Sequence, residues 1–184
     1  MYSVYTISRQ YGSGGSTLAI KLSELSGYQL IWREVINKAA IQIGSPDMAL
    51  AVIDEFGFLG MYPDEDTCMK FKLAMEKVVI EKANEGKVII VGRASQMILK
   101  DIPNCFHIRA IASLETRIKN VQRTKNVSEK GAKAQIEDSD RYRQNFLKKM
   151  YDVDWNEPSL YDLTINMDRF SPDQIAPWLL KFQD

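Results

Sequence analysis

The chain has 184 residues, of which 45% are hydrophobic and 26% are charged, as in an ordinary globular protein. Its 24 basic and 24 acidic residues give a formal net charge of zero. This balance argues against binding of polymeric nucleic acid, because proteins that bind it carry a net basic surface. We expect a chain of this length to fold as a single domain over residues 1–184.

Cysteine and histidine are too few to predict a metal centre. Cys68 and Cys105 form no C-x-x-C pair, and His107 is the only histidine. We expect both thiols to be reduced, as in a cytoplasmic protein. The apolar run Val88–Val91 is much shorter than a membrane span. The sequence does not show the basic start and long apolar run of a signal peptide, so we expect none. No membrane partner is therefore predicted.

Short β-branched runs alternate with longer amphipathic stretches along the chain. Strands are expected at residues 2–7, 28–31, 88–91, 105–110 and 163–166. Helices are expected near residues 16–25, 32–43, 46–56, 66–84, 94–99, 113–123, 134–150 and 172–182. We expect Ser16 or Thr17 to cap the first helix, Gly27 to end it, and residues 126–133 to be a mobile connection. The alternation favours an α/β fold with a mostly parallel sheet.

The helix expected over residues 66–84 has a long apolar face. Such a face usually packs into the core of its own domain. It could also form the interface of a homodimer, and the sequence does not separate the two interpretations.

A glycine-rich segment directly follows the first predicted strand and reads SRQYGSGGST over Ser8–Thr17. Three glycines in four positions allow successive backbone amides to converge on one anion, and the next helix adds its positive N-terminal end. A plain glycine turn is the alternative. We favour a phosphate-binding loop, made by Gly12, Ser13, Gly14, Gly15, Ser16 and Thr17.

This segment departs from the standard P-loop, G-x-x-x-x-G-K-[ST]. Arg9 stands at the first glycine position, Gly15 at the lysine position and Ser16 at the hydroxyl position, where it would contact Mg²⁺. The P-loop lysine normally stays with the transferred phosphate. We therefore expect another cation, Arg9 or an arginine of a closing lid, to replace it.

Four segments together resemble the cytidylate kinase-like family: TISRQYGSGG, VIIVGRA, the DSDRYR stretch at residues 138–143, and YDLTINMDR. The resemblance implies the fold of P-loop nucleoside monophosphate kinases, with three layers and a five-stranded parallel sheet. It implies a helical acceptor-binding insert at about residues 32–65 and an arginine-bearing lid at about residues 117–150. It also implies phosphoryl transfer from ATP, with Mg²⁺, to a small nucleotide acceptor such as CMP or dCMP.

Carried over position by position, the resemblance assigns candidate roles. Arg33, Arg93 and Asp140 are candidates for binding the acceptor, and Arg93 matches an arginine that holds the acceptor phosphate. Any one of these side chains could instead form an ordinary surface ion pair. The candidate catalytic cations are Arg9, Arg117, Arg123, Arg141 and Arg143.

Three positions depart from the family pattern. Gly15 replaces the lysine, and Val91 and Ala94 stand where cytidylate kinases have acidic residues before and after the Gly-Arg pair. A second hypothesis is therefore a nucleotide- or phosphate-sensing protein, derived from a kinase, with weak or no turnover. A third hypothesis, a structural interaction module, accounts for the alternating pattern but not for the glycine loop.

Overall fold

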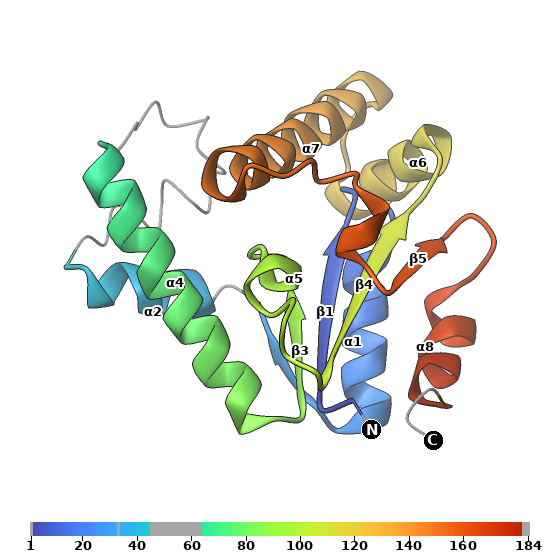
Figure 1. Cartoon of the computed structure of the whole chain (residues 1–184). Helices are drawn as coiled ribbons and strands as arrows, with labels where there is room; N and C mark the ends of the chain where they lie inside the picture. The colour runs from blue at the N-terminus through green and yellow to red at the C-terminus, as the bar shows by residue number, and fades with distance from the viewer. Residues whose placement is uncertain (1, 33, 45–63, 182–184) are drawn as a thin grey trace.

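The computed structural model describes residues 2–32, 34–44 and 64–181. In this part of the chain, one sheet has five strands in the order β2-β3-β1-β4-β5 (Figure 1). Every pairing is parallel, which confirms the predicted α/β fold. The strands are β1 (Val4–Arg9), β2 (Gln29–Ile31), β3 (Val88–Val91), β4 (Cys105–Ile111) and β5 (Leu163–Asn166).

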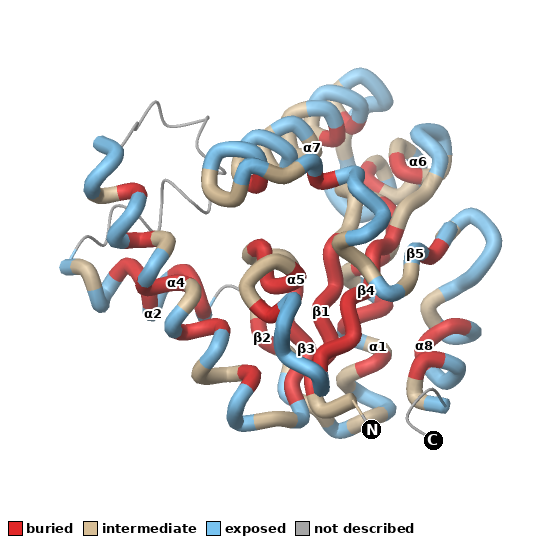
Figure 2. Tube along the Cα trace, viewed as in Figure 1, coloured by how far each residue is buried: buried red, intermediate tan, exposed pale blue. Residues whose placement is uncertain are grey.

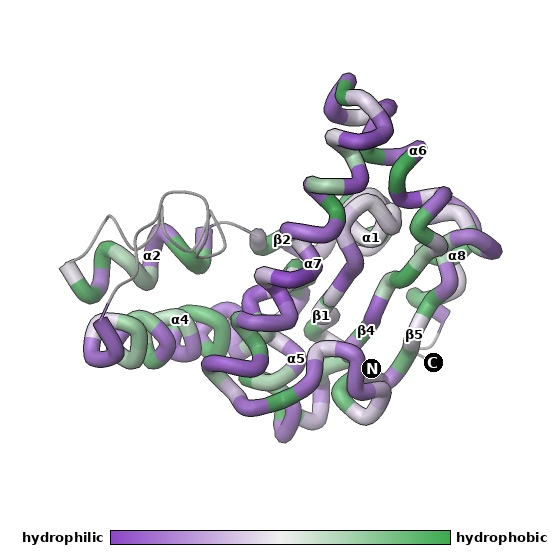
Figure 3. The backbone as a smooth tube through the Cα atoms, turned by 90° about the horizontal axis from the view of Figure 1, so that it is seen from above, coloured by the Kyte–Doolittle hydropathy of each residue, from purple (hydrophilic) through white to green (hydrophobic). Residues whose placement is uncertain are grey.

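Helices cover both faces of the sheet and cross its carboxyl edge. Seen from above, α1 and α8 lie on one side of the strands and α4 and α5 on the other (Figure 3). These helices are α1 (Gly15–Ser26), α2 (Glu34–Gln42), α4 (Glu65–Glu85), α5 (Ser95–Ile98) and α8 (Pro172–Lys181). The pair α6 (Leu114–Lys125) and α7 (Glu129–Tyr151) lies over the carboxyl ends of the strands, and a short 3-10 turn, η1 (Pro158–Leu160), precedes β5 (Figure 1).

The core has two parts because side chains alternate across the sheet. On β3, Val88 and Ile90 pack with α2 and α4, whereas Ile89 and Val91 pack with α1 and α8. The strand is buried at all four positions, as expected for a strand covered on both faces. Figure 2 shows that the central strands are the most continuously buried part of the chain, while α6 and α7 are largely exposed.

The caps of α1 are only partly as predicted. Gly27 ends the helix in the left-handed conformation, with φ of 71°, which confirms that prediction. The expected cap by Ser16 or Thr17 is wrong: the helix begins at Gly15, and Gly14 is the N-cap, with φ of 92° and no side-chain hydrogen bond. The glycine loop therefore continues directly into the first turn of the helix.

The polar connection predicted at residues 126–133 is mostly helix. Asn126 ends α6 in the left-handed conformation, and the side chain of Ser128 accepts a hydrogen bond from the backbone N–H of Gly131 at the start of α7. Two caps so close together leave a very short connection. The predicted mobile loop is thus wrong because its polar residues form the first turns of α7.

Smaller differences affect two other predicted helices. The second helix begins at Glu34 rather than at residue 32, and α5 is a single turn, Ser95–Ile98, because Arg93 and Ala94 are left-handed. The helix expected at residues 46–56 lies outside the described residues. Within the described residues, no helix is both long enough and apolar enough to cross a bilayer.

The two cysteines are buried thiols on different elements. Cys68 lies on α4 and Cys105 begins β4. Burial raises the pKa of the Cys105 thiol to about 11. At neutral pH this thiol is therefore protonated and unreactive.

Candidate functional site

The glycine loop crosses the carboxyl edge of the sheet between β1 and α1. Gly12 and Gly14 both have positive φ, of 79° and 92°. A Cβ atom at Gly12 would lie 2.8 Å from the carbonyl oxygen of Arg117, so α6 is packed against the loop too closely for any side chain there. Asn120 of α6 also donates a hydrogen bond to the Gly12 carbonyl at 2.9 Å. The loop is therefore held from above by α6.

Some amides of the loop have internal partners and others do not. The N–H of Ser13 donates to the carbonyl of Gln10 at 3.2 Å, and the N–H of Gly15 donates to the Ser13 hydroxyl at 3.3 Å. Because the helix begins at Gly15, the N–H groups of Ser16 and Thr17 have no acceptor within it. These first-turn amides, together with the positive end of α1, suit a bound anion.

A cavity of about 910 Å³ opens over the loop, large enough for a nucleotide-sized ligand. Residues 12–17 form its floor, and Arg123 with other residues of α6 and α7 forms its walls. The segment that follows β5 closes one side. The residues of that segment that line the cavity are Met167, Phe170, Ser171, Pro172 and Asp173.

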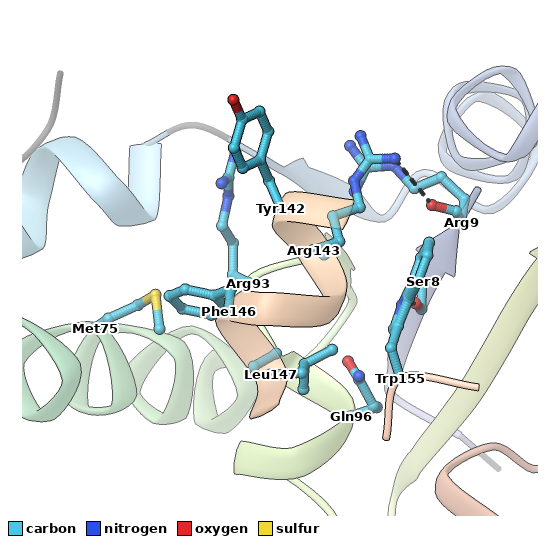
Figure 4. Close-up of a pocket in the computed structure, with 12 residues that line it drawn as sticks. Ser8, Arg9, Met75, Arg93, Gln96, Tyr142, Arg143, Phe146, Leu147 and Trp155 are labelled. Atoms are coloured by element: carbon cyan, nitrogen blue, oxygen red, sulfur yellow. Dashed lines mark hydrogen bonds between the residues drawn. The ribbon is translucent and has the colours of Figure 1, made fainter. Parts of the chain in front are cut away.

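A second, smaller pocket of about 60 Å³ adjoins the large cavity (Figure 4). Among the described residues, the two share four lining residues, all of them large polar side chains, and none that lines the small pocket is acidic. The shared residues are Arg9, Arg93, Tyr142 and Arg143. The remaining lining residues are Ser8, Met75, Gly92, Ala94, Gln96, Phe146, Leu147 and Trp155. Three arginines therefore stand at the boundary between the two spaces.

Arg93 lies in a strained turn at the end of β3. Gly92, Arg93 and Ala94 are successively left-handed, with φ of 71°, 63° and 52°. Non-glycine residues avoid this conformation, and each instance costs about 1–3 kcal/mol. The Nε of Arg93 lies 3.5 Å from the backbone carbonyl of Trp32. Strain of this kind concentrates at functional sites, and here it places the arginine beside both cavities.

Arg143 reaches the same boundary from α7. Its Nη1 donates to the backbone carbonyl of Arg9 at 3.3 Å (Figure 4). The same Nη1 lies 3.3 Å from a carboxylate oxygen of Asp140. Its guanidinium carbon lies 5.7 Å from the centre of the Tyr11 ring. This predicted lid arginine is therefore already docked on the residues that precede the glycine loop.

Arg117 and Asp140 form a buried ion pair between α6 and α7. Their closest approach is 2.6 Å, and the Arg117 side chain is 7% exposed. Burial lowers the pKa of Arg117, and the charge of Asp140 opposes that shift. Neither residue lines either cavity, so the structure does not bring them to the positions predicted for a catalytic cation and an acceptor ligand. They instead hold the two helices and the loop together.

The remaining predicted arginines differ in placement. Arg123 lines the large cavity. Arg141 is exposed, pairs with Asp138 at 2.5 Å and lines neither cavity. Arg33 lies outside the described residues. The structure thus gathers Arg9, Arg93 and Arg143 and leaves Arg141 apart.

Sequence reasoning missed Trp155, which lines the small pocket. Its indole N–H donates to the hydroxyl of Ser8 at 2.8 Å, and the guanidinium of Arg109 lies 4.6 Å from its ring centre. Arg109 is 5% exposed and also donates hydrogen bonds to the Trp155 carbonyl and the Asn156 side chain. The sequence signal for this contact is Arg109 itself, a charged residue inside the apolar strand CFHIRAI, because arginine is almost never fully buried without a partner.

Gln96 is a second residue that sequence reasoning missed. It lies in the one-turn helix α5, is 3% exposed and lines the small pocket. Its Nε2 has no hydrogen-bond partner among the described residues, although the side chain lies near the Tyr161 hydroxyl. A buried amide donor without a partner is costly. It is therefore a group that a ligand in this pocket could satisfy.

The family of this chain follows from comparison with known proteins. Residues 4–169 match the model of the cytidylate kinase-like family. The chain belongs to the cytidylate kinase-like family. It is 28% identical over 173 residues to the cytidylate kinase of Thermococcus sibiricus, covering 94% of this chain and 83% of that protein. The cytidylate kinase of Pyrococcus horikoshii is 26% identical over 172 residues, with the same two shares.

Solved structures agree on the fold. An uncharacterized protein from Eubacterium ventriosum superposes with a TM-score of 0.76 at 22% identity, covering 97% of this chain and 96% of that one. A shikimate kinase from Acinetobacter baumannii superposes with a TM-score of 0.52 at 14% identity, covering 97% and 90%. The predicted P-loop kinase fold is therefore confirmed, and family membership supports a nucleotide kinase function for this cytidylate kinase-like protein.

The positions that depart from the family pattern lie in defined places. Val91 is buried on the α1 side of the sheet, and Ala94 packs with Leu147 and Trp155 in a small apolar cluster. Ala94 also lines the small pocket, next to Arg93. Among the described residues, no cluster of three or more His, Cys, Asp or Glu side chains could hold a metal by itself.

Proposed function

We propose that this protein transfers a phosphoryl group from ATP to the phosphate of a nucleoside monophosphate, with CMP or dCMP as the first candidates. The observation that carries the proposal is the meeting of two cavities at Arg9, Arg93 and Arg143. A phosphoryl donor and an acceptor must approach within bonding distance, and their combined negative charge must be offset there. Three arginines at one boundary supply that charge.

The large cavity is the proposed donor site. Residues 12–17 would hold the β-phosphate of ATP against the amides that begin α1, and Arg123 would contact the nucleotide from α6. Ser16 would be the protein ligand of Mg²⁺, which on binding neutralises charge on the β- and γ-phosphates. The lining of the cavity extends to the segment after β5, and the adenosine part of ATP would lie beside that segment.

The small pocket, with its arginine boundary, is the proposed acceptor side. Arg93 would hold the acceptor phosphate, and the unpartnered Nε2 of Gln96 would donate to an oxygen of the acceptor. The lining is otherwise apolar or aromatic, with Met75, Phe146 and Trp155. Arg33, which lies outside the described residues, remains a predicted acceptor contact.

The described residues that line the small pocket include no acidic side chain, and this lining is compatible with an anionic acceptor. A phosphate oxygen attacks without first losing a proton, so no general base is required. The bond between the γ-phosphorus and the oxygen that bridges it to the β-phosphate breaks, and a new bond to the acceptor oxygen forms. An alcohol acceptor would need a base to take its proton.

A coupled assay with ATP, Mg²⁺ and each nucleoside monophosphate tests the proposal. We expect ADP formation that depends on Mg²⁺ and is fastest with CMP or dCMP. Absence of turnover with every nucleoside monophosphate at high protein concentration would contradict it. A matched assay with the corresponding nucleosides should give no turnover, because they lack the phosphate that Arg93 would hold.

A second candidate is a nucleotide sensor without turnover, and the replacements at Gly15, Val91 and Ala94 favour it. Thermal-shift measurements separate the two candidates. Stabilisation by ATP or CMP without ADP formation would support the sensor, because a ligand that binds only the folded state raises its apparent stability. No shift with any nucleotide or polyphosphate would contradict both.

A further inference from the structure

Two positions of the P-loop pattern are exchanged in this chain. The pattern places glycine first and lysine seventh, whereas Arg9 and Gly15 occupy those positions in this sequence. Considered separately, Gly15 is a replacement of the catalytic lysine and Arg9 is a replacement of the first glycine. The geometry links the two changes.

The stem of Arg9 crosses the space that a side chain at Gly15 would need. A Cβ atom built at Gly15 would lie 2.6 Å from the Cβ of Arg9 and 2.7 Å from the Cβ of Ala110. Real Cβ atoms essentially never approach so closely. Gly15 has no positive φ, so its backbone does not require glycine. The requirement for glycine at this position therefore comes from the side chains of Arg9 and Ala110.

The guanidinium of Arg9 ends beside the N-terminus of α1. Its Nε lies 3.4 Å from the hydroxyl of Ser16, and its guanidinium carbon lies 5.5 Å from the centre of the Trp32 ring. A Cβ atom at Gly92 would lie 2.6 Å from its Nη1. Gly15 thus leaves the stem of Arg9 room to extend from β1 across the loop, and the left-handed Gly92 lies beside the guanidinium.

This location is the one that the proposed reaction needs. Arg9 lines both cavities, and of the three boundary arginines it is the one that contacts Ser16, the proposed Mg²⁺ ligand. A guanidinium presents several donors in a plane and can bind two phosphate oxygens at once, and it remains charged at any working pH. It can therefore hold a phosphoryl group between donor and acceptor.

We propose that Arg9 is the catalytic cation of this protein and takes the place of the P-loop lysine, with Gly15 as the glycine that admits its side chain. The proposal rests on the function proposed above. Arg9 binds the γ-phosphoryl group while its bond to the β-phosphate breaks and its bond to the acceptor oxygen forms. Arg9 itself exchanges no proton and forms no covalent bond.

Kinetics of Arg9→Met and Arg9→Lys test the catalytic role, with Arg169→Met as a matched control. Arg169 is exposed and lines neither cavity. We expect Arg9→Met to lower kcat by about 10²–10³-fold, the usual effect of removing one transition-state donor, while the Kd for MgADP changes by less than about fivefold. Arg9→Lys should recover at least tenfold over Arg9→Met, and Arg169→Met should match the unmodified protein.

The outcomes separate this proposal from the broader one. Arg9→Met with kcat within threefold of the unmodified protein would overturn the role of Arg9 and leave the kinase proposal intact. Absence of turnover and of nucleotide binding in the unmodified protein would overturn both. Should Arg9→Met fail to fold, Arg9→Lys decides the catalytic role, because it keeps the charge and most of the stem and should retain measurable turnover.

A double-mutant cycle tests, without an activity measurement, whether the stem of Arg9 occupies the space beside Gly15. Gly15→Ala places a Cβ against Arg9 and should lower Tm by roughly 5 °C in the unmodified protein. In an Arg9→Gly background one of the two close contacts is gone and the contact with Ala110 remains, so the same substitution should lower Tm by a smaller amount. An equal loss in both backgrounds would show that Arg9 does not occupy this space and would overturn the proposal.

Discussion

The carboxylate of Asp140 accepts a hydrogen bond of 2.8 Å from the backbone N–H of Tyr11, directly before the glycine loop. The other oxygen of the same carboxylate pairs with Arg117 at 2.6 Å. One side chain of α7 thus joins α6, α7 and the loop. Closure of the proposed lid over a nucleotide would therefore act directly on the loop that binds its phosphates.

Replacing Asp140 by Asn tests this connection. The amide can still accept from Tyr11, but the buried guanidinium of Arg117 loses its counter-charge. Breaking a buried ion pair at one partner is strongly destabilising, and we expect a loss of about 3 kcal/mol in the free energy of unfolding. Urea denaturation measures it. Asp138→Asn is the matched control, because the Asp138–Arg141 pair is exposed and should contribute little.

Paired glycine substitutions separate loop strain from ligand binding. Gly14 and Gly27 are both left-handed, and neither would bring an added Cβ into a close contact. Alanine at either position should therefore cost about 1–2 kcal/mol of backbone strain. Only Gly14→Ala should also weaken MgADP binding, because Gly14 lines the large cavity and Gly27 lies at the far end of α1. Equal affinities in the two variants would count against the loop as a phosphate site.

The sheet and the glycine loop could be predicted because their signals are local. Val88–Val91 is a β-branched run that Gly92 directly follows, and such a run has few alternatives to a buried parallel strand. The glycines of the loop directly follow β1, so the order of strand, loop and helix can be inferred from the sequence. The structure adds that α6 is packed against Gly12, a contact between segments more than 100 residues apart that no local pattern contains.

The site itself could be predicted only in part, because the sequence does not show where the guanidinium group of each arginine lies. Arg117, Arg141 and Arg143 look equivalent in the sequence, yet they are buried in an ion pair, exposed, and at the cavity boundary respectively. Their placement depends on which face of α6 or α7 each occupies and on the partners across that face. Asp140 decides much of this, through contacts that span 23 and 129 residues of sequence.

Arg9 illustrates a different limit of prediction from sequence. The sequence reveals its departure from the P-loop pattern and predicts a replacement cation, but it leaves a lid arginine as an equal alternative. The decisive fact is the close approach of the Arg9 stem to Gly15, which depends on the path of a side chain. Such facts require the strands to be placed side by side, as in the pairing of Arg9 with Ala110.

The histidine of β4 gives the folded state a pH dependence. His107 is buried, its Nδ1 lies 2.8 Å from the Thr6 hydroxyl, and desolvation lowers its pKa, although Asp162 and the carbonyl of Leu99 oppose the shift. The unfolded chain, with a pKa of about 6.5, then binds more protons than the folded chain. The stability that neutral His107 provides is therefore present above pH of about 6.5 and is lost as the pH falls through the folded-state pKa.

His107→Gln removes that titration. We expect the difference in free energy of unfolding between the unmodified protein and the variant to shrink as the pH falls from about 7.5 to about 5. Urea denaturation at a series of pH values measures it, and the carboxylates common to both proteins cancel in the difference. A difference that stays constant or grows on acidification would contradict a lowered pKa for His107.

Arg143 and Arg141 lie two residues apart on α7 and provide a stringent comparison. The Arg143 side chain is 15% exposed and lies at the boundary of both cavities, whereas that of Arg141 is 60% exposed and faces Asp138. If the lid supplies charge to the transition state, Arg143→Lys should lower kcat/KM by about 10²-fold, because a single ammonium cannot reproduce two-point contact with phosphate oxygens. Arg141→Lys should stay within twofold. Because both substitutions keep the net charge, a similar loss in both would contradict a role specific to Arg143, and a loss confined to Arg141 would place the reacting groups on the other face of the helix.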